Sequence, residues 1–222
     1  MKKILVLSGS LRIKGNSDLI CDEFTRGAKE AENDVDKIHV ASKKIAQCLA
    51  CYYCREHHGE CVQKDAMADV LQKMINADVI VPSSAVFFYS ITAQLKAVID
   101  RTVARWLEVK NKEFYFIVTM VDEDLESANR TLADMQGYVD CVQGGVVKGT
   151  LSATAYINKV RSKDPKLCKA PTKWTKTPNL FFQTSSFLFQ INTRSKIGKS
   201  LEAFSIPYIG KYLLKSLTWV TS

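Results

Sequence analysis

Short apolar runs and amphipathic segments alternate along the first two thirds of the chain. The expected strands share continuous or alternating apolar positions and lie at 4–7, 35–40, 79–81, 114–120 and, poorer because of two glycines, 142–147. The expected helices share apolar positions at helical spacing and lie at 16–28, 65–74, 91–106 and 125–139. Strands that alternate with helices of this length predict an α/β fold, a doubly wound sheet of five parallel strands with helices on both faces.

The alternation ends near Gly149, and the charge changes there as well. Residues 149–222 hold 12 Lys or Arg against 2 Asp or Glu, so this third of the chain carries a charge of +10 and the remainder carries −2, which gives the net charge of +8. Three prolines between 165 and 178 argue against one long helix, and aromatic patches follow. We therefore expect a domain at 1–150 and a basic, aromatic C-terminal arm at 151–222, packed on the domain or on another subunit.

The segment after the first strand brings small hydroxyl residues, an arginine and a glycine to the start of a helix. The residues expected to contact a ligand there are Ser8, Ser10, Arg12, Asn16 and Ser17. A phosphate would meet free helix N–H groups, the positive end of the helix dipole and one guanidinium. Ser and Asn are equally suited to capping an ordinary helix, so the residue types leave both readings open. Since the dinucleotide and Walker glycine patterns are absent, a bound phosphate would belong to a mononucleotide.

Four of the seven cysteines lie within one short segment, the cysteine loop (residues 48–61). They are Cys48, Cys51, Cys54 and Cys61, with two-residue gaps between the first three. Short gaps let four thiolates converge on an iron–sulfur cluster, and a structural zinc would accept the same donors. Disulfides and four uncoordinated thiols are the remaining alternatives. His57 and His58, in the same loop, either donate hydrogen bonds to the sulfurs or are solvated.

Two segments resemble a known family. Gly9-Ser10-Leu11-Arg12 with Gly15-Asn16-Ser17 resembles the Gly-Ser-x-Arg-x-x-Gly-Asn-Ser/Thr loop of the flavodoxin-like NAD(P)H-dependent FMN reductases. Residues 84–101 are similar to that family's Ser-Pro-x-Tyr-x-Gly-x-x-x-x-x-Leu-Lys segment, with alanine in place of the proline and tyrosine in place of the glycine. The resemblance implies the strand order 2-1-3-4-5 and a flavin ring lined by Ser84, Ala85, Val86, Phe87 and Phe88. The alternative for Phe87, Phe88 and Tyr89 is that at least one packs in the core.

The cysteine loop resembles the compact Cys-x2-Cys-x2-Cys-x(4–7)-Cys motif of the iron–sulfur flavoproteins. This resemblance implies an FMN-dependent oxidoreductase that moves electrons between NAD(P)H or a ferredoxin-like donor and a small-molecule acceptor. In the iron–sulfur flavoproteins the cysteine motif carries a 4Fe–4S cluster beside the flavin, so the resemblance extends to such a cluster here. It also implies a homodimer or homotetramer. No secretory or membrane-spanning run follows Met1, so we expect a cytoplasmic protein. The rival hypothesis is a flavodoxin-like scaffold whose basic arm binds membrane or nucleic acid, and it is disfavoured because the arm contains no run of consecutive basic residues.

Overall fold

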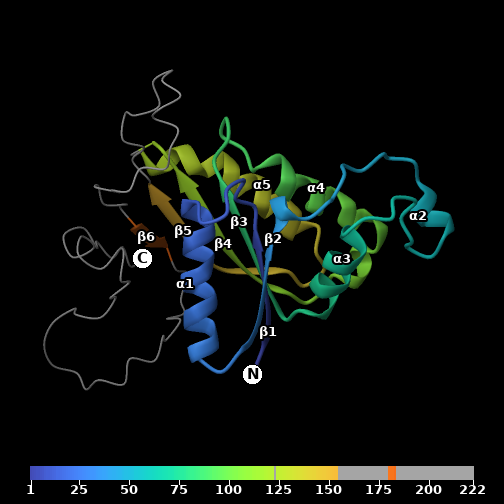
Figure 1. The fold of residues 1–222 in the computed structure, drawn as a ribbon, viewed down its shortest axis with the longest axis horizontal. Helices are drawn as coiled ribbons and strands as arrows, with labels where there is room; N and C mark the ends of the chain where they lie inside the picture. The colour runs from blue at the N-terminus through green and yellow to red at the C-terminus, as the bar shows by residue number, and fades with distance from the viewer. Residues whose placement is uncertain (123, 155–179, 184–222) are drawn as a thin grey trace, which may run out of the picture.

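The computed structural model describes residues 1–122, 124–154 and 180–183, and its centre is one twisted sheet (Figure 1). The strands are β1 (Lys3–Ser8), β2 (Asp34–His39), β3 (Val79–Ala85), β4 (Glu113–Met120), β5 (Val146–Thr154) and β6 (Leu180–Gln183). Their order in the sheet is β2-β1-β3-β4-β5-β6, with β1 to β5 parallel and β6 antiparallel to β5. The predicted five-stranded parallel sheet of order 2-1-3-4-5 is confirmed, and β6 is an addition to it.

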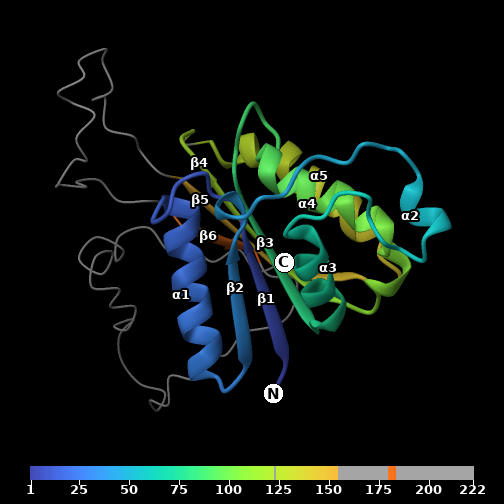
Figure 2. The ribbon, with the colours of Figure 1, turned by 45° about the vertical axis from the view of Figure 1, so that its right-hand side comes forward.

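Helices cover both faces of this sheet (Figure 2). They are α1 (Asn16–Glu30), α2 (Tyr53–Glu56), α3 (Met67–Asn76), α4 (Ala93–Arg101) and α5 (Asn129–Asp140), with 3-10 turns η1 (Val40–Ser42), η2 (Thr102–Ala104), η3 (Trp106–Glu108) and η4 (Leu125–Ala128). Successive side chains of a strand point to opposite faces, so Ile4 and Val6 pack with α1 while Leu5 and Leu7 pack with α3 and α4. The sheet is therefore buried on both faces, which explains the continuous apolar runs of its central strands.

Two predicted boundaries are wrong. The fifth strand was expected at 142–147, but residues 142–145 form a turn with Gly144 at φ +69°, and β5 runs from Val146 to Thr154, beyond the predicted domain boundary. The helix expected at 91–106 ends at Arg101. Thr102 donates its hydroxyl proton to the carbonyl of Ile99, and the chain continues in 3-10 turns.

The arm expected at 151–222 lies outside the described residues apart from 151–154 and β6. Within the part of the chain that the structure does describe, none of the helices is long and apolar enough to cross a membrane.

Candidate functional site

The first loop after β1 is tied to the loop after β3 at the carboxyl edge of the sheet. The Gly9 N–H donates to the Ser83 carbonyl at 2.8 Å, and the Thr92 hydroxyl donates to the Gly9 carbonyl at 2.9 Å. A side chain at Gly9 would meet the Ser83 oxygen at 2.6 Å, so only glycine permits this approach. The two loops that the sequence selected thus form one structure, between neighbouring strands, where ligands bind in open α/β sheets.

The start of α1 has no side-chain cap. Gly15 occupies the N-cap position, so the serines and the asparagine of this loop, which the sequence offered as possible capping residues, do not cap the helix. The Arg12 Cβ lies beside this start, because it is 3.3 Å from the position that a Cβ on Gly15 would take. Among the described residues, the exposed Arg12 guanidinium makes no hydrogen bond or ion pair. Free helix N–H groups beneath an unpaired guanidinium fit a phosphate group.

Behind the loop, a buried carboxylate holds its backbone in place. Asp18 accepts hydrogen bonds from the Ser8 hydroxyl and the Lys14 N–H, both at 2.8 Å, and pairs with the Lys37 Nζ at 2.7 Å. Burial by itself would raise the pKa of Asp18, but the Lys37 ion pair and the two hydrogen bonds outweigh it and hold the pKa below its usual value. The Ser8 hydroxyl is therefore committed to Asp18, and Ser8 supports the loop from the inside.

The loop after β1 (residues 8–17) is called the phosphate loop below. Its other predicted ligand-contacting residues have different surroundings. The Ser10 hydroxyl donates to the Arg12 carbonyl at 2.8 Å and accepts from the Arg12 N–H, so it shapes the turn that carries Arg12. Ser17 is buried and shares a hydrogen bond of 2.6 Å with the Thr119 hydroxyl at the end of β4. Asn16, half-buried, is the first residue of α1. Arg12 and the backbone thus present the available donors, and the serines mainly fix the backbone.

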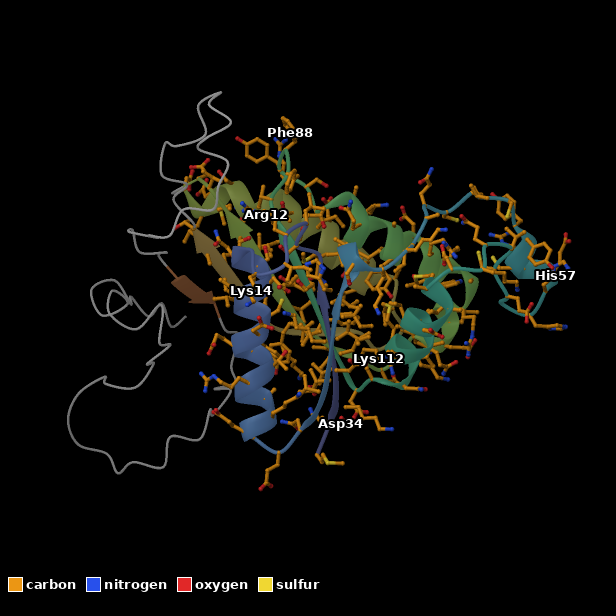
Figure 3. All side chains as sticks on the ribbon, viewed as in Figure 1. Arg12, Lys14, Asp34, His57, Phe88 and Lys112 are labelled. Atoms are coloured by element: carbon orange, nitrogen blue, oxygen red, sulfur yellow. The ribbon has the colours of Figure 1, made fainter. Side chains whose placement is uncertain are left out.

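The second loop divides into an anchored part and an exposed tip. Ser84 is buried, accepts from the Thr92 N–H and donates to the Ala85 carbonyl. Val86 is half-buried, and its N–H donates to the Thr119 carbonyl. The three aromatic residues that follow are all exposed, which refutes the alternative that at least one packs in the core (Figure 3).

The cysteine loop lies apart from this edge, and a buried arginine clamps its two ends (Figures 1 and 3). Arg101 is 2% exposed and pairs with Asp65 at 2.8 Å, while it also donates to the Ala46 carbonyl and, at 3.3 Å, to the Cys61 sulfur. The Asp65 pair outweighs the effect of burial and raises the pKa of Arg101. Arg101 ends α4, whose start is tied to Gly9. One helix, about 14 Å long by its rise per residue, therefore links the two regions.

The thiols in the loop are free, and three of them are half-buried whereas Cys51 is exposed. In residues 1–122 and 124–154, no three His, Cys, Asp or Glu side chains are arranged to hold a single metal ion. A 4Fe–4S cluster needs a different arrangement of the four thiolates from a single metal ion, because each thiolate binds its own iron. His57 stacks on Tyr53 and bonds its carbonyl, so no sulfur is its partner here.

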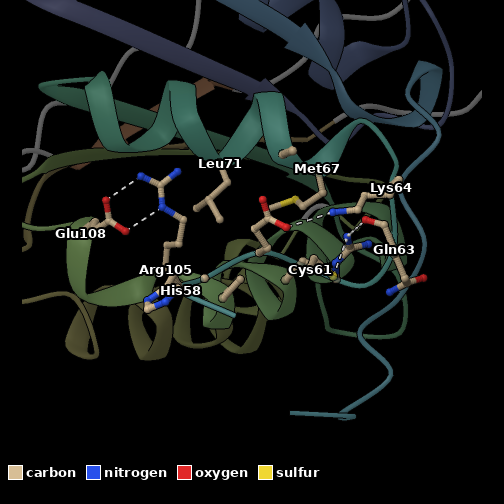
Figure 4. Close-up of a pocket in the computed structure, with 13 residues that line it drawn as sticks. His58, Cys61, Gln63, Lys64, Met67, Leu71, Arg105 and Glu108 are labelled. Carbon is tan, nitrogen blue, oxygen red and sulfur yellow. Dashed lines mark hydrogen bonds and ion pairs between the residues drawn. The ribbon is translucent and has the colours of Figure 1, made fainter. Parts of the chain in front are cut away.

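A cavity of about 360 Å³ lies beside the cysteine loop (Figure 4). Met67 and Leu71 of α3 form its apolar side, and Arg105, paired with Glu108, and Cys61 lie on the others. The lysine and the arginines that line the cavity each pair with an acidic side chain. The cavity is at the opposite end of α4 from the phosphate loop, so it is not the predicted flavin site.

Outside the loop, the two cysteines of the described domain differ. Cys21 is buried, as its place in a helix suggests, and burial raises the pKa of its thiol to about 11. Cys141 is exposed.

The residues that support the site from a distance are not evident from the sequence. Lys37, Thr92 and Thr119 come from β2, the loop before α4 and β4, and only the fold brings them to the phosphate loop. Thr92 had a local signal, because a threonine near the start of the helix predicted at 91–106 is a typical N-cap residue. Together, the doubly wound sheet and the loop at its carboxyl edge define a flavodoxin-like fold with a candidate site for a mononucleotide.

Comparison with known sequences specifies this class further. The sequence pattern of the family described as NADPH-dependent FMN reductase matches residues 2–152, and the chain belongs to that family. An iron–sulfur flavoprotein of Archaeoglobus fulgidus is 36% identical over 101 residues, which are 46% of this chain and 45% of that protein. An iron–sulfur flavoprotein of Methanosarcina thermophila is 36% identical over 101 residues, 46% of this chain and 52% of the other. The match spans about half the length of these relatives.

Solved structures share the fold at low sequence identity. An NADH:FMN oxidoreductase in its apo form has a TM-score of 0.53 at 14% identity, over 68% of this chain and 75% of the other. An NAD(P)H:quinone oxidoreductase from Methanothermobacter marburgensis has a TM-score of 0.53 at 18% identity, over 68% of this chain and 83% of the other. These likenesses confirm the flavodoxin-like fold.

Proposed function

We propose that the chain is an FMN-dependent oxidoreductase that takes electrons from NAD(P)H or a ferredoxin-like donor and passes them to a small-molecule acceptor. The observation that carries the proposal is the uncapped start of α1 beneath the unpaired Arg12, inside the region that matches the family. FMN, when bound, supplies the hydride and single-electron chemistry itself. The protein therefore needs to bind, orient and shield it, and no dedicated acid or base is required.

The described residues suit these tasks. Arg12 and the first-turn N–H groups of α1 would hold the phosphate, since both present unused donors at one point. Ser10 and Asp18 would keep that loop in its binding shape through their backbone contacts. The residues proposed to lie along the flavin ring, on the loop tied to the phosphate loop through Gly9, are Ser84, Ala85, Val86, Phe87 and Phe88. A homodimer or homotetramer remains part of the proposal on family grounds alone.

The test is an anaerobic purification followed by a visible spectrum and flavin extraction. We expect bound or reconstitutable FMN, bleached by NADPH or NADH and restored by an added acceptor. A colourless protein that does not bind added FMN would contradict the proposed function. If the bound FMN is bleached only by a reduced ferredoxin, the oxidoreductase function stands and the electron donor is ferredoxin-like, not NAD(P)H.

A second proposal concerns the cysteine loop, as ligands of a 4Fe–4S cluster. Two observations support it: similar proteins carry the name iron–sulfur flavoprotein, and Arg101 already donates a hydrogen bond to the Cys61 sulfur. Hydrogen bonds of this kind to ligand sulfurs help set the potential of a cluster. Iron and sulfide analysis of the same anaerobic sample tests it. About four irons per chain in the wild type, lost in Cys51→Ser and kept in Cys141→Ser, supports the cluster; iron-free wild-type protein with an intact flavin contradicts it.

The hypothesis that the basic arm binds membrane or nucleic acid concerns residues outside the described part of the chain. It stays a prediction.

A further inference from the structure

A two-residue hairpin, with Phe88 at its tip, projects from the loop after β3 (Figure 3). Phe87 and Ser90 exchange both backbone hydrogen bonds at 3.0 Å, which closes the hairpin, and its central residues Phe88 and Tyr89 have φ of +49° and +63°. Positive φ at both central positions is the pattern of a type I′ turn, which favours Asn-Gly because larger side chains are strained there. A strained turn of this kind persists only where its surroundings hold it.

Helix α5 supplies contacts that hold this hairpin. The Asp134 carboxylate accepts hydrogen bonds from the Ser90 hydroxyl at 2.5 Å and from the Ile91 N–H at 3.4 Å. One helical turn earlier, the Arg130 guanidinium lies 5.6 Å from the centre of the Tyr89 ring. Residues four apart share one face of a helix, so a single face of α5 holds two consecutive hairpin residues. Both α5 residues lie outside the two segments on which the family resemblance depends.

The Asp134 contact lies on the leg of the hairpin that the sheet does not hold. The leg toward β3 is fixed to the sheet, since the Val86 N–H bonds the Thr119 carbonyl at the end of β4. The other leg leads through Ile91 to Thr92, which joins this loop to the phosphate loop. Asp134 accepts from the two residues just before Thr92. Without Asp134, this leg would lose its hydrogen bonds to α5.

We propose that Asp134 is a positioning residue for the flavin, because it holds the hairpin, and with it the ring-lining residues 84–88, in the shape that receives the ring. This inference rests on the proposed function and adds a residue of α5 to it. A loop that already has its binding shape loses less conformational entropy when a ligand binds, so release of the hairpin lowers the affinity. Asp134 acts through Ser90 and Ile91, on the ring side of the site. Its loss should therefore affect FMN and riboflavin equally.

The experiment measures the dissociation constants of FMN and riboflavin by quenching of flavin fluorescence, and the visible circular dichroism of the saturated flavin, in the full chain. Asp134→Ala and Ser90→Ala remove the bond from either side, and a double variant combines them. Asp134→Asn keeps one side-chain oxygen as an acceptor. The control is Asp140→Ala, which removes another exposed carboxylate of α5, bonded to Gln136. Both aspartates are exposed, so neither replacement leaves a cavity in the core.

We expect Asp134→Ala and Ser90→Ala each to weaken the binding of FMN and riboflavin by the same factor, about tenfold. Both should change the circular dichroism of the saturated flavin, which reports how the ring is held. The double variant should lose no more than either single one, because all three lack the same bond. Asp134→Asn and Asp140→Ala should stay within about twofold of the wild type.

Unchanged affinities in Asp134→Ala, or a loss for FMN alone, would overturn the proposal. Additive losses in the double variant would also overturn it, as would weaker binding with an unaltered spectrum of the saturated flavin, because Asp134 would then serve only the stability of the fold. A wild-type chain that binds neither flavin is a different result: it refutes the proposed function, and the positioning role with it.

Discussion

Replacement of Asp18 by asparagine tests how the phosphate loop is held. Asp18 is 4% exposed and receives three donors, the Ser8 hydroxyl, the Lys14 N–H and the Lys37 ammonium. Asparagine keeps the size of the side chain but offers one oxygen and no charge. At least one of the three donors must then face an amide NH2 group.

The magnitude follows from what remains around Lys37. Removal of one partner of a fully buried pair costs about 3–5 kcal/mol. Lys37 keeps the Asp22 carboxylate at 2.5 Å, so its charge is not left alone. The loss is closer to that of one hydrogen bond to a charged group, about 2–3 kcal/mol in the free energy of unfolding. Asp22→Asn removes the exposed partner of the same lysine and should cost about 1 kcal/mol or less.

The pH dependence of this difference has a definite sign. The folded-state pKa of Asp18 is lowered, so its carboxylate stabilises the protein above the pKa of the unfolded chain, about 3.9, and this stabilisation is lost as the pH falls through the folded pKa. Urea unfolding of the flavin-free protein, followed by circular dichroism from pH 7 to pH 3.5, should show the gap between wild type and Asp18→Asn narrowing toward the acid end. A gap under about 0.5 kcal/mol at pH 7, or one of constant size across the range, would refute this role.

Two further substitutions test the contacts that join the parts of the molecule. Gly9→Ala places a Cβ 2.6 Å from the Ser83 carbonyl, so we expect a loss of about 2 kcal/mol or more in unfolding free energy and weaker FMN binding, both measurable by thermal unfolding with and without FMN. Arg101→Met leaves a buried carboxylate unpaired and should cost about 3–5 kcal/mol, with faster alkylation of Cys61 by iodoacetamide in mass spectrometry. Arg105→Met removes a surface pair and should change neither quantity appreciably; equal effects from both arginines would contradict the clamp.

The sheet was predictable because its central strands are buried on both faces. Continuous apolar runs such as 114–120 are typical of strands buried on both faces. The helical spacing of apolar residues located the helices between them. The ends of the helices and strands were harder to predict. The predicted helix at 91–106 continued through Val103 on periodicity alone, but Val103 is exposed and the helix ends at Arg101. The segment with two glycines near residue 144 was predicted to be a weak strand, but it forms a turn.

The phosphate loop was predictable because its donors are consecutive in sequence. Its supports were not, since the pairing of Asp18 with Lys37 depends on β2 lying beside α1. The hairpin was also missed. Type I′ turns are expected at Asn-Gly, and Phe88-Tyr89 instead has the composition of a buried strand. Local chemistry therefore located the candidate site, whereas the long-range contacts that hold it required the fold.

The most direct test of the central claim compares FMN with riboflavin, which lacks the phosphate, by quenching of flavin fluorescence. We predict that the wild type binds FMN more tightly than riboflavin and that Arg12→Ala lowers FMN affinity about 10- to 100-fold, the loss of a charge-assisted hydrogen bond, while riboflavin affinity changes little. Arg26→Ala, which removes an exposed arginine paired on the far part of α1, is the control. Equal affinities for the two flavins in the wild type, or an equal loss for both in Arg12→Ala, would contradict the account.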